Sequence, residues 1–142
     1  NGLGSGGGGG TISILGARVT GNNAVYGGGL DLTSLAAQVR LSNLIVNGNF
    51  ASGGGRLAIT STPNFSVSGG YFKGNYATFG GGIYVENSTG SILRVSVLSN
   101  FAKDRGGGVD HDFGGTVTLQ AAKVTANTAP YGSNVYGAFT FV

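Results

Sequence analysis

Acidic and basic side chains gather at one place in this sequence, the segment KDRGGGVDHDF at positions 103–113. Asp110 and Asp112 alternate along a predicted strand, so both carboxylates project from the same side, about 7 Å apart by the rise of two strand residues. Two carboxylates at that distance suit an inverting hydrolase acting on a polysaccharide, and calcium binding is a second option. An exposed, charged strand end explains the same residues without chemistry, and we favour that interpretation.

A repeat runs through the whole chain. Five segments share an apolar residue, two variable residues, an asparagine, one further residue and an alanine, followed by a glycine cluster and an apolar–x–apolar run. They are VTGNNAVYGGGLDL (19–32), VNGNFASGGGRLAI (46–59), FKGNYATFGGGIYV (72–85), VLSNFAKDRGGGVDH (97–111) and VTANTAPYGSNVYG (124–137). The asparagines Asn22, Asn49, Asn75, Asn100 and Asn127 follow one another at intervals of 27, 26, 25 and 27 residues. Such a period is typical of solenoid proteins.

Apolar columns at fixed distances from these asparagines predict strands. Three residues before the asparagine stand Val19, Val46, Phe72, Val97 and Val124; eight before it stand Ile14, Leu41, Val67, Ile92 and Leu119; beyond the glycines stand Leu30, Leu57, Ile83, Val109 and Val135. The apolar positions alternate with other residues, which is the period of a strand with one buried face. We therefore predict an all-β solenoid of about five coils of ~26 residues, each with three short strands.

The glycine clusters have two possible roles. A phosphate-binding loop needs a helix N-terminus behind it, and no helical period follows any cluster. A sharp corner needs a residue that tolerates positive φ, which glycine does without penalty. The clusters are therefore predicted to be corners.

The repeated asparagines are predicted to form a structural ladder. A buried corner leaves backbone groups in need of partners, and an asparagine amide both donates and accepts. When coils stack, these amides can bond one another and the turn backbone.

The acidic residues do not converge on a catalytic centre outside the 110–112 segment. Asp31 shares the outward column of Asp110 but lies three coils away, about 14 Å at the spacing between strands. His111 falls in the inward column of Leu32, Ile59 and Val85 and is predicted to be a hydrogen-bonded core histidine. We expect no metal ion, no cofactor and no enzymatic activity.

The composition excludes several classes of protein. Of 142 residues, 30 are glycine, 40% are hydrophobic and 9% are charged, so the chain should fold rather than remain disordered. The net charge of +3 is spread thinly, whereas nucleic-acid binders concentrate positive charge in a patch. No cysteine is present, so disulfides and thiolate metal sites are excluded. No apolar run reaches the ~20 residues of a membrane span.

One corner varies in length between repeats and is predicted to lie outside the stack. It follows the strand after the glycines and reads TSLAAQ, TSTPN, ENST and DFGGT in successive copies. Two N-glycosylation sequons fall on or beside it, at Asn64 and Asn87. Their shared placement favours an extracellular or cell-surface protein carrying covalent glycans.

The repeat resembles that of the chlamydial polymorphic outer-membrane proteins, whose signature is Phe-x-x-Asn followed by Gly-Gly-Ala-apolar. FKGN at 72–75 matches the first half, while the other copies have valine for phenylalanine; GGGL, GGGI and GGGV have glycine for alanine, and the last copy is GSNV. The resemblance covers residues 12 to 137. It implies a right-handed parallel β-helix of the pectate-lyase-like type on a secreted or surface protein used for adhesion or structure.

The two ends suggest how the domain is used. We expect a glycine-rich arm at residues 1–10 and a single β-helix domain at residues 11–142, with no polar cap at either end of the stack. Bare strand edges invite another subunit, and head-to-tail contact that does not close forms a filament. We therefore predict a subunit of an extracellular filament or fibre that assembles with itself. The alternatives are an adhesin segment of a longer β-helix and a polysaccharide-active β-helix enzyme.

Overall fold

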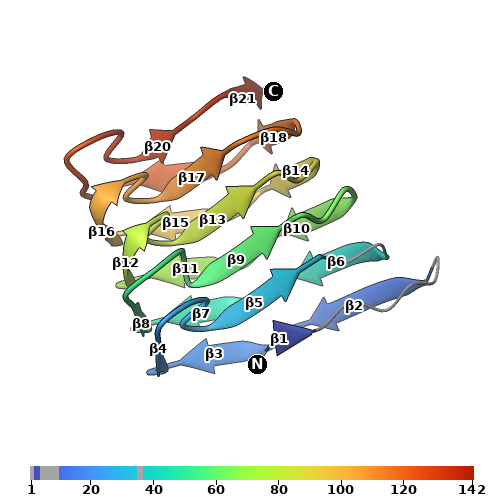
Figure 1. Cartoon of the computed structure of the whole chain (residues 1–142), viewed down its shortest axis with the longest axis horizontal. Helices are drawn as coiled ribbons and strands as arrows, with labels where there is room; N and C mark the ends of the chain where they lie inside the picture. The colour runs from blue at the N-terminus through green and yellow to red at the C-terminus, as the bar shows by residue number, and fades with distance from the viewer. Residues whose placement is uncertain (1, 4–9, 35–36) are drawn as a thin grey trace.

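The chain winds into a right-handed parallel β-helix (Figure 1), seen in a computed structural model that describes residues 2–3, 10–34 and 37–142. Every strand pairing in the described residues is parallel, and no helix is present in them. About five coils stack on one another, with β1 at one end of the stack and β21 at the other. This confirms the predicted fold class.

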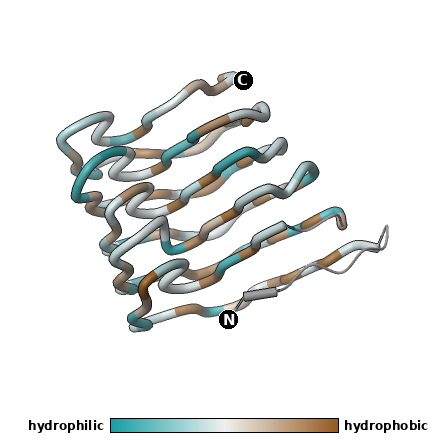
Figure 2. Tube along the Cα trace, in the orientation of Figure 1, coloured by the Kyte–Doolittle hydropathy of each residue, from teal (hydrophilic) through white to brown (hydrophobic). Residues whose placement is uncertain are grey.

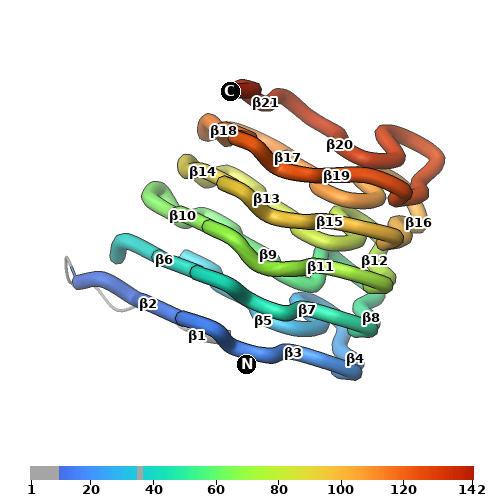
Figure 3. Tube along the Cα trace, turned by 180° about the vertical axis from the view of Figure 1, so that it is seen from behind, coloured from blue at the N-terminus to red at the C-terminus, as the bar shows by residue number. Residues whose placement is uncertain are grey.

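Four sheets run along the solenoid, and each of the first four coils adds one strand to each sheet, whereas the fifth coil adds none to the fourth sheet, sheet D. Sheet A contains β1 (Gly2–Leu3), β5 (Leu30–Thr33), β9 (Leu57–Thr60), β13 (Ile83–Glu86), β17 (Val109–Asp112) and β20 (Val135–Tyr136). Sheet B contains β2 (Thr11–Leu15), β6 (Gln38–Ser42), β10 (Phe65–Ser68), β14 (Gly90–Leu93), β18 (Val117–Gln120) and β21 (Phe139–Phe141). Sheet C, which faces the viewer in Figure 3, contains β3 (Arg18–Thr20), β7 (Ile45–Asn47), β11 (Tyr71–Lys73), β15 (Ser96–Leu98) and β19 (Lys123–Thr125).

Sheet D corrects the prediction of three strands per coil. It contains β4 (Asn23–Ala24), β8 (Phe50–Ala51), β12 (Tyr76–Phe79) and β16 (Phe101–Arg105), which directly follow the repeated asparagines. The sequence pattern did not predict these strands because the segment that they share is only two residues long. It holds a single inward position, the repeated alanine, and one position cannot show a period of two.

The interior consists of columns of similar apolar side chains, stacked in register from coil to coil. Val67 pairs with Leu41 on one side and with Ile92 on the other, so the predicted column is a physical stack. Figure 2 shows hydrophobic segments at corresponding points of successive coils. The column ten residues before the asparagine contains Gly90, and the neighbouring Phe65 ring fills the space, since a Cβ on Gly90 would lie 2.5 Å from that ring.

Glycines occupy the corner between sheets D and A for two different reasons. Gly80 opens its cluster with φ of 55°, a conformation that L side chains rarely adopt. Gly81 has no such φ, but a Cβ there would lie 2.3 Å from the Gly107 carbonyl oxygen of the next coil. The corner therefore needs glycine both for its turn and for the close approach of stacked backbones.

The asparagine ladder lies at the corner between sheets C and D. The side-chain oxygen of Asn75 accepts from the backbone N–H and the side-chain amide of Asn49, both at 3.1 Å. The Asn75 amide donates to the Asn100 side-chain oxygen at 2.8 Å and to the Val46 carbonyl at 3.0 Å. The same pattern links Asn22 to Asn49 and Asn100 to Asn127.

The ladder ends on a residue that the repeat did not indicate. Asn127 donates its backbone N–H and its side-chain amide to the side-chain oxygen of Asn134, both at 3.2 Å. Asn134 belongs to the same coil as Asn127, seven residues later. The fifth coil therefore closes its own end of the ladder without a further coil.

The glycine-rich arm predicted at residues 1–10 lies largely outside the described residues. Within it, β1 pairs with β5 through Gly2–Asp31 and Leu3–Leu32 and so extends sheet A beyond the first coil.

Replacing a central ladder residue should destabilise the fold. We expect Asn75→Ala to lower the free energy of unfolding by about 3 kcal/mol, because it leaves the buried Asn49 N–H without a partner and removes one donor from the Val46 carbonyl. Asn22→Ala, at the exposed end of the ladder, should cost less than about 1 kcal/mol. Urea unfolding followed by circular dichroism measures both; equal losses would show that the ladder is not a main source of stability.

Candidate functional site

The outer face of sheet A carries four of the five acidic residues of the chain. Strand register places Asp31, Ala58, Tyr84, Asp110 and Tyr136 in one outward column. A second outward column contains Thr33, Thr60, Glu86 and Asp112. This column arrangement agrees with the prediction that Asp31 and Asp110 share a face while lying three coils apart.

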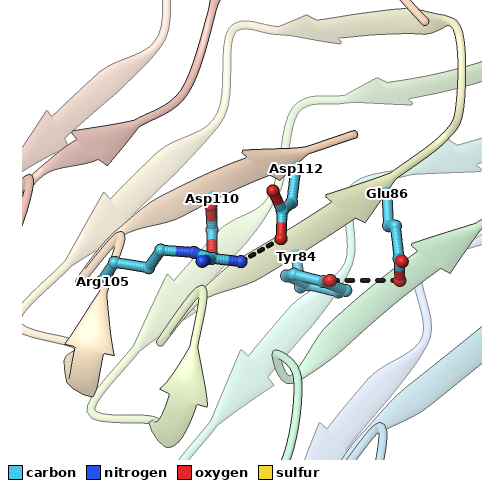
Figure 4. Close-up of polar contacts among 5 residues, drawn as sticks. All are labelled: Tyr84, Glu86, Arg105, Asp110 and Asp112. Atoms are coloured by element: carbon cyan, nitrogen blue, oxygen red, sulfur yellow. Dashed lines mark hydrogen bonds and ion pairs between the residues drawn. The ribbon is translucent and has the colours of Figure 1, made fainter. Parts of the chain in front are cut away.

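Arg105 organises the carboxylates of the fourth coil. It ends β16 at the corner and extends over sheet A, where Nε lies 3.1 Å from Asp110 Oδ2 and NH2 pairs with Asp112 Oδ2 (Figure 4). Its guanidinium also lies over two rings, 4.6 Å from the Phe79 centroid and 5.3 Å from the Tyr136 centroid. One planar cation is thus held by two carboxylates and two aromatic side chains.

This geometry opposes a catalytic role for the predicted pair. Asp110 is 0% exposed, so no substrate reaches it in this conformation. Arg105 occupies the space at which both carboxylates point. Asp110 and Asp112 are therefore brought together as members of an ion-pair cluster.

Asp110 is unusual in its electrostatics. Burial raises the pKa of its carboxyl from the usual 3.8 to about 6, against the opposing hydrogen bond and charge of Arg105. Its Oδ1 atom finds no hydrogen-bond partner among the described residues. The ionised form is therefore only partly compensated by the single guanidinium.

A second polar contact lies one coil earlier on the same face. The Tyr84 hydroxyl donates to Glu86 Oε2 at 3.1 Å (Figure 4). Burial, followed by the charge of Glu86, raises the pKa of Tyr84 above its usual value. The phenol therefore remains a neutral donor to the carboxylate.

A groove opens beside this contact, between the first and third coils. It has a volume of about 350 Å³ and is lined by Tyr26, Gly27, Asp31, Thr33, Gly54, Ala58, Thr60, Phe79, Tyr84 and Glu86. Its floor is the second coil, whose lining residues are small. Its walls hold aromatic rings and carboxylates, so the groove offers both a stacking surface and negative charge.

His111 lies where its column predicts, in the interior against sheet B. Its Nδ1 is 2.7 Å from the Ala138 carbonyl oxygen and its Nε2 is 3.0 Å from the Gly114 carbonyl oxygen. These bonds tie the fourth coil to the fifth and to the variable corner. The residue is structural in this arrangement.

The two sequon asparagines, Asn64 and Asn87, are both exposed. Each lies on the corner that leads from sheet A to sheet B, the corner with the variable length. A glycan at either position would project from the side of the solenoid.

Sequence reasoning missed an aromatic stack and a buried arginine. Phe50, Tyr76 and Phe101 follow successive ladder asparagines and stack with ring centroids 4.9 Å apart, a column that the repeat alignment contains. Arg56 stands where the first, third and fourth coils have glycine and is 0% exposed, and none of its guanidinium nitrogens finds a hydrogen-bond partner among the described residues. Burial lowers its pKa to about 9.

Metal and membrane sites receive no support in the part of the chain that the structure describes. No group of three His, Cys, Asp or Glu side chains there is close enough to hold a metal ion. No helix in that part has the length and apolar character needed to cross a bilayer.

Comparison with known proteins finds no match among family models, curated proteins or solved structures. What the protein does must therefore be inferred from its own residues.

The buried carboxyl of Asp110 should make stability rise on acidification. Its pKa of about 6 in the folded state exceeds its usual 3.8, so between these values the folded state binds more protons than the unfolded state. We expect this group to add about 1 kcal/mol to the free energy of unfolding as the pH falls from 7 to 5. Urea unfolding of wild type and Asp110→Asn at both pH values measures the difference. Asp31→Asn should retain the rise, and identical slopes for wild type and Asp110→Asn would contradict the assignment.

Removing the buried charge of Arg56 should stabilise the protein. The Phe50 ring, whose centroid lies 5.8 Å from the guanidinium carbon, is a weak partner for a buried cation, so Arg56→Met, which preserves length and apolar contact, should raise the free energy of unfolding by about 3 kcal/mol. The matched control is Arg40→Met, which replaces an exposed arginine of β6 and should change stability by less than about 0.5 kcal/mol. A loss of stability in Arg56→Met would show that the guanidinium has a partner.

Proposed function

We propose that this chain is a non-enzymatic structural protein, a subunit of an extracellular filament or surface fibre that assembles head-to-tail through its end faces. The observation that supports this most strongly is the state of the strand edges. No described strand pairs with the outer edges of β2, β3 and β4 at one end, or of β19, β20 and β21 at the other, while the edge of β16 is already covered by residues 128–131 of the fifth coil. Unpaired parallel edges are templates for another strand of the same kind.

The end faces also carry apolar surface. At the last coil a hollow of about 520 Å³ is lined by residues that include Leu119, Val124, Val135, Phe141 and Val142. In the middle of the stack, the equivalent inward positions are covered by the next coil. A further coil of the same type would bury this surface as the internal coils bury one another.

The two end faces differ, so contact between them is heterologous. At the first coil a hollow of about 570 Å³ includes Arg18, Val19, Asn22 and Leu30 among its lining. Asn22 donates to Asn49, while its own side-chain oxygen receives no hydrogen bond from the described residues. Joining unlike faces along one axis propagates without closing and produces a filament.

An extracellular location is proposed from the sequon positions. Asn64 and Asn87 are exposed on the corner between sheets A and B. Glycans there would cover the side of the solenoid and leave both end faces free for stacking.

A second candidate function is a segment of a longer surface β-helix that acts as an adhesin. The groove between Tyr26 and Phe79 favours it, because a lateral groove remains accessible when coils continue at both ends. The polysaccharide-active alternative is less well supported, because Asp110 is buried and both aspartates pair with Arg105.

A charge on the last coil should block assembly. Phe141 is 68% exposed and lines the hollow of the final coil, so Phe141→Asp should fold normally but leave the protein monomeric. The control is Phe113→Asp, at a side chain that is 73% exposed on the variable corner, which should leave assembly intact. Analytical ultracentrifugation and electron microscopy of the three proteins provide the test.

Dispersed wild-type monomers at all concentrations would overturn the filament proposal and favour the adhesin segment. Filaments that survive in Phe141→Asp would show that assembly uses a different surface.

A further inference from the structure

The groove on sheet A exists because the second coil lacks side chains that its neighbours have. At the corner, Gly54 pairs with Phe79 of the third coil, which in turn pairs with Arg105 of the fourth. In the outward column the second coil has Ala58, where the third has Tyr84. The small side chains of the second coil therefore form the floor of the groove, between two coils that carry large outward side chains.

The glycines of the second coil hold the aromatic walls in place. A Cβ on Gly53 would lie 2.4 Å from the Tyr26 ring, and a Cβ on Gly54 would lie 2.9 Å from the Tyr84 ring. Both rings thus pack directly against glycine backbone. Any larger residue at these positions would displace a wall or fill the space.

The walls are negatively charged as well as aromatic. Thr33 donates to Asp31 Oδ1 at 2.7 Å, and Tyr84 donates to Glu86 Oε2 at 3.1 Å. One oxygen of each carboxylate is therefore positioned by a hydroxyl group. None of the described residues that line the groove is a lysine, an arginine or a histidine. Rings with a negative face and two carboxylates together complement an organic cation.

The fourth coil shows which chemical group can occupy a site of carboxylates and aromatic rings on this sheet. Two coils further on, the same face of sheet A holds the Arg105 guanidinium against the Phe79 and Tyr136 rings, paired with Asp110 and Asp112. In the groove, Tyr26 and Phe79 supply the corner aromatics, and Asp31 and Glu86 supply the carboxylates. The second coil contributes no cation of its own at this position.

We propose that the groove between the first and third coils binds the arginine side chain of a basic peptide or partner protein. The guanidinium stacks on the aromatic walls and lies between Asp31 of the first coil and Glu86 of the third, whereas the partners of Arg105, Asp110 and Asp112, lie on a single strand. A planar guanidinium suits this site because it stacks on rings and pairs with carboxylates simultaneously. The site lies on the side of the solenoid and shares only Gly27 with the hollow at the first coil.

A peptide titration tests this site. The probe is a blocked Gly-Arg-Gly peptide added to the isotope-labelled full chain, with the amide resonances of Gly54, Ala58 and Thr60 followed by NMR. The control peptide replaces arginine with citrulline, a neutral side chain of nearly the same shape. We expect the arginine peptide to shift these resonances. The citrulline peptide should bind at least about tenfold more weakly than the arginine peptide.

Matched protein variants assign the effect to the groove. Asp31→Asn and Glu86→Gln, which keep an oxygen to accept from Thr33 and Tyr84, should each weaken the arginine peptide several-fold. Asp104→Asn removes the same charge on the fourth coil, outside the groove, and should leave the affinity unchanged.

Three results would overturn the proposal. The first is the absence of shifts at Gly54, Ala58 and Thr60 at millimolar arginine peptide. The second is equal binding of the citrulline peptide. The third is stronger binding of a neutral glucan oligosaccharide in the same groove, which would assign the aromatic walls to a sugar.

Discussion

The buried amide at the corner between sheets C and D is the constraint on which the solenoid depends. The side chain of each inner ladder asparagine bonds backbone groups of the coil before it, and its own N–H is bonded by the asparagine of the next coil, so no inner coil can complete its hydrogen bonding alone. Because each inner ladder amide must bond to the amide of the next coil, neighbouring coils are fixed both in their rotation about the solenoid axis and in their position along it. The apolar columns then fall into register, and the interior becomes a continuous pile of like side chains. Burial of those columns contributes most of the stabilisation, but the amides determine which residues meet.

Outside the stack, the same register places different residues above one another. On sheet A, the outward column changes from a carboxylate to alanine, to tyrosine and back to a carboxylate in successive coils. Where a coil supplies its own cation, as with Arg105, both carboxylates pair with it and Asp110 is buried. Where a coil has only glycine and alanine, a groove remains between charged and aromatic walls. The regular interior therefore leaves the surface free to vary from coil to coil.

The sequence predicts the periodic part of this structure well. Columns counted from the asparagines identify the strands of sheets A, B and C, the corner glycines and the inward position of His111, because each depends on local spacing alone. The strands of sheet D were missed because the part that all four share is two residues long, which is too short to show a period. The burial of Asp110 was missed because its outward parity implies exposure, while the covering atoms come from Arg105 and Tyr136, whose side-chain directions no spacing rule supplies. Arg56 was missed for a related reason, since an arginine in a glycine column is expected to turn outward.

Asn134 gives the final coil a different kind of boundary from those below it. Between inner coils, each ladder amide must bond to the ladder amide of the next coil. Any rotation or slip of one coil would therefore leave buried donors without acceptors. Above the fifth coil those donors are already occupied within the coil, so a partner would be held by strand edges and apolar contact alone. Such a joint tolerates a choice of rotational setting and can part without exposing unsatisfied amides. If copies stack as we propose, the contact above the fifth coil would therefore be separable, with rigid coils within each copy and exchangeable contacts between copies.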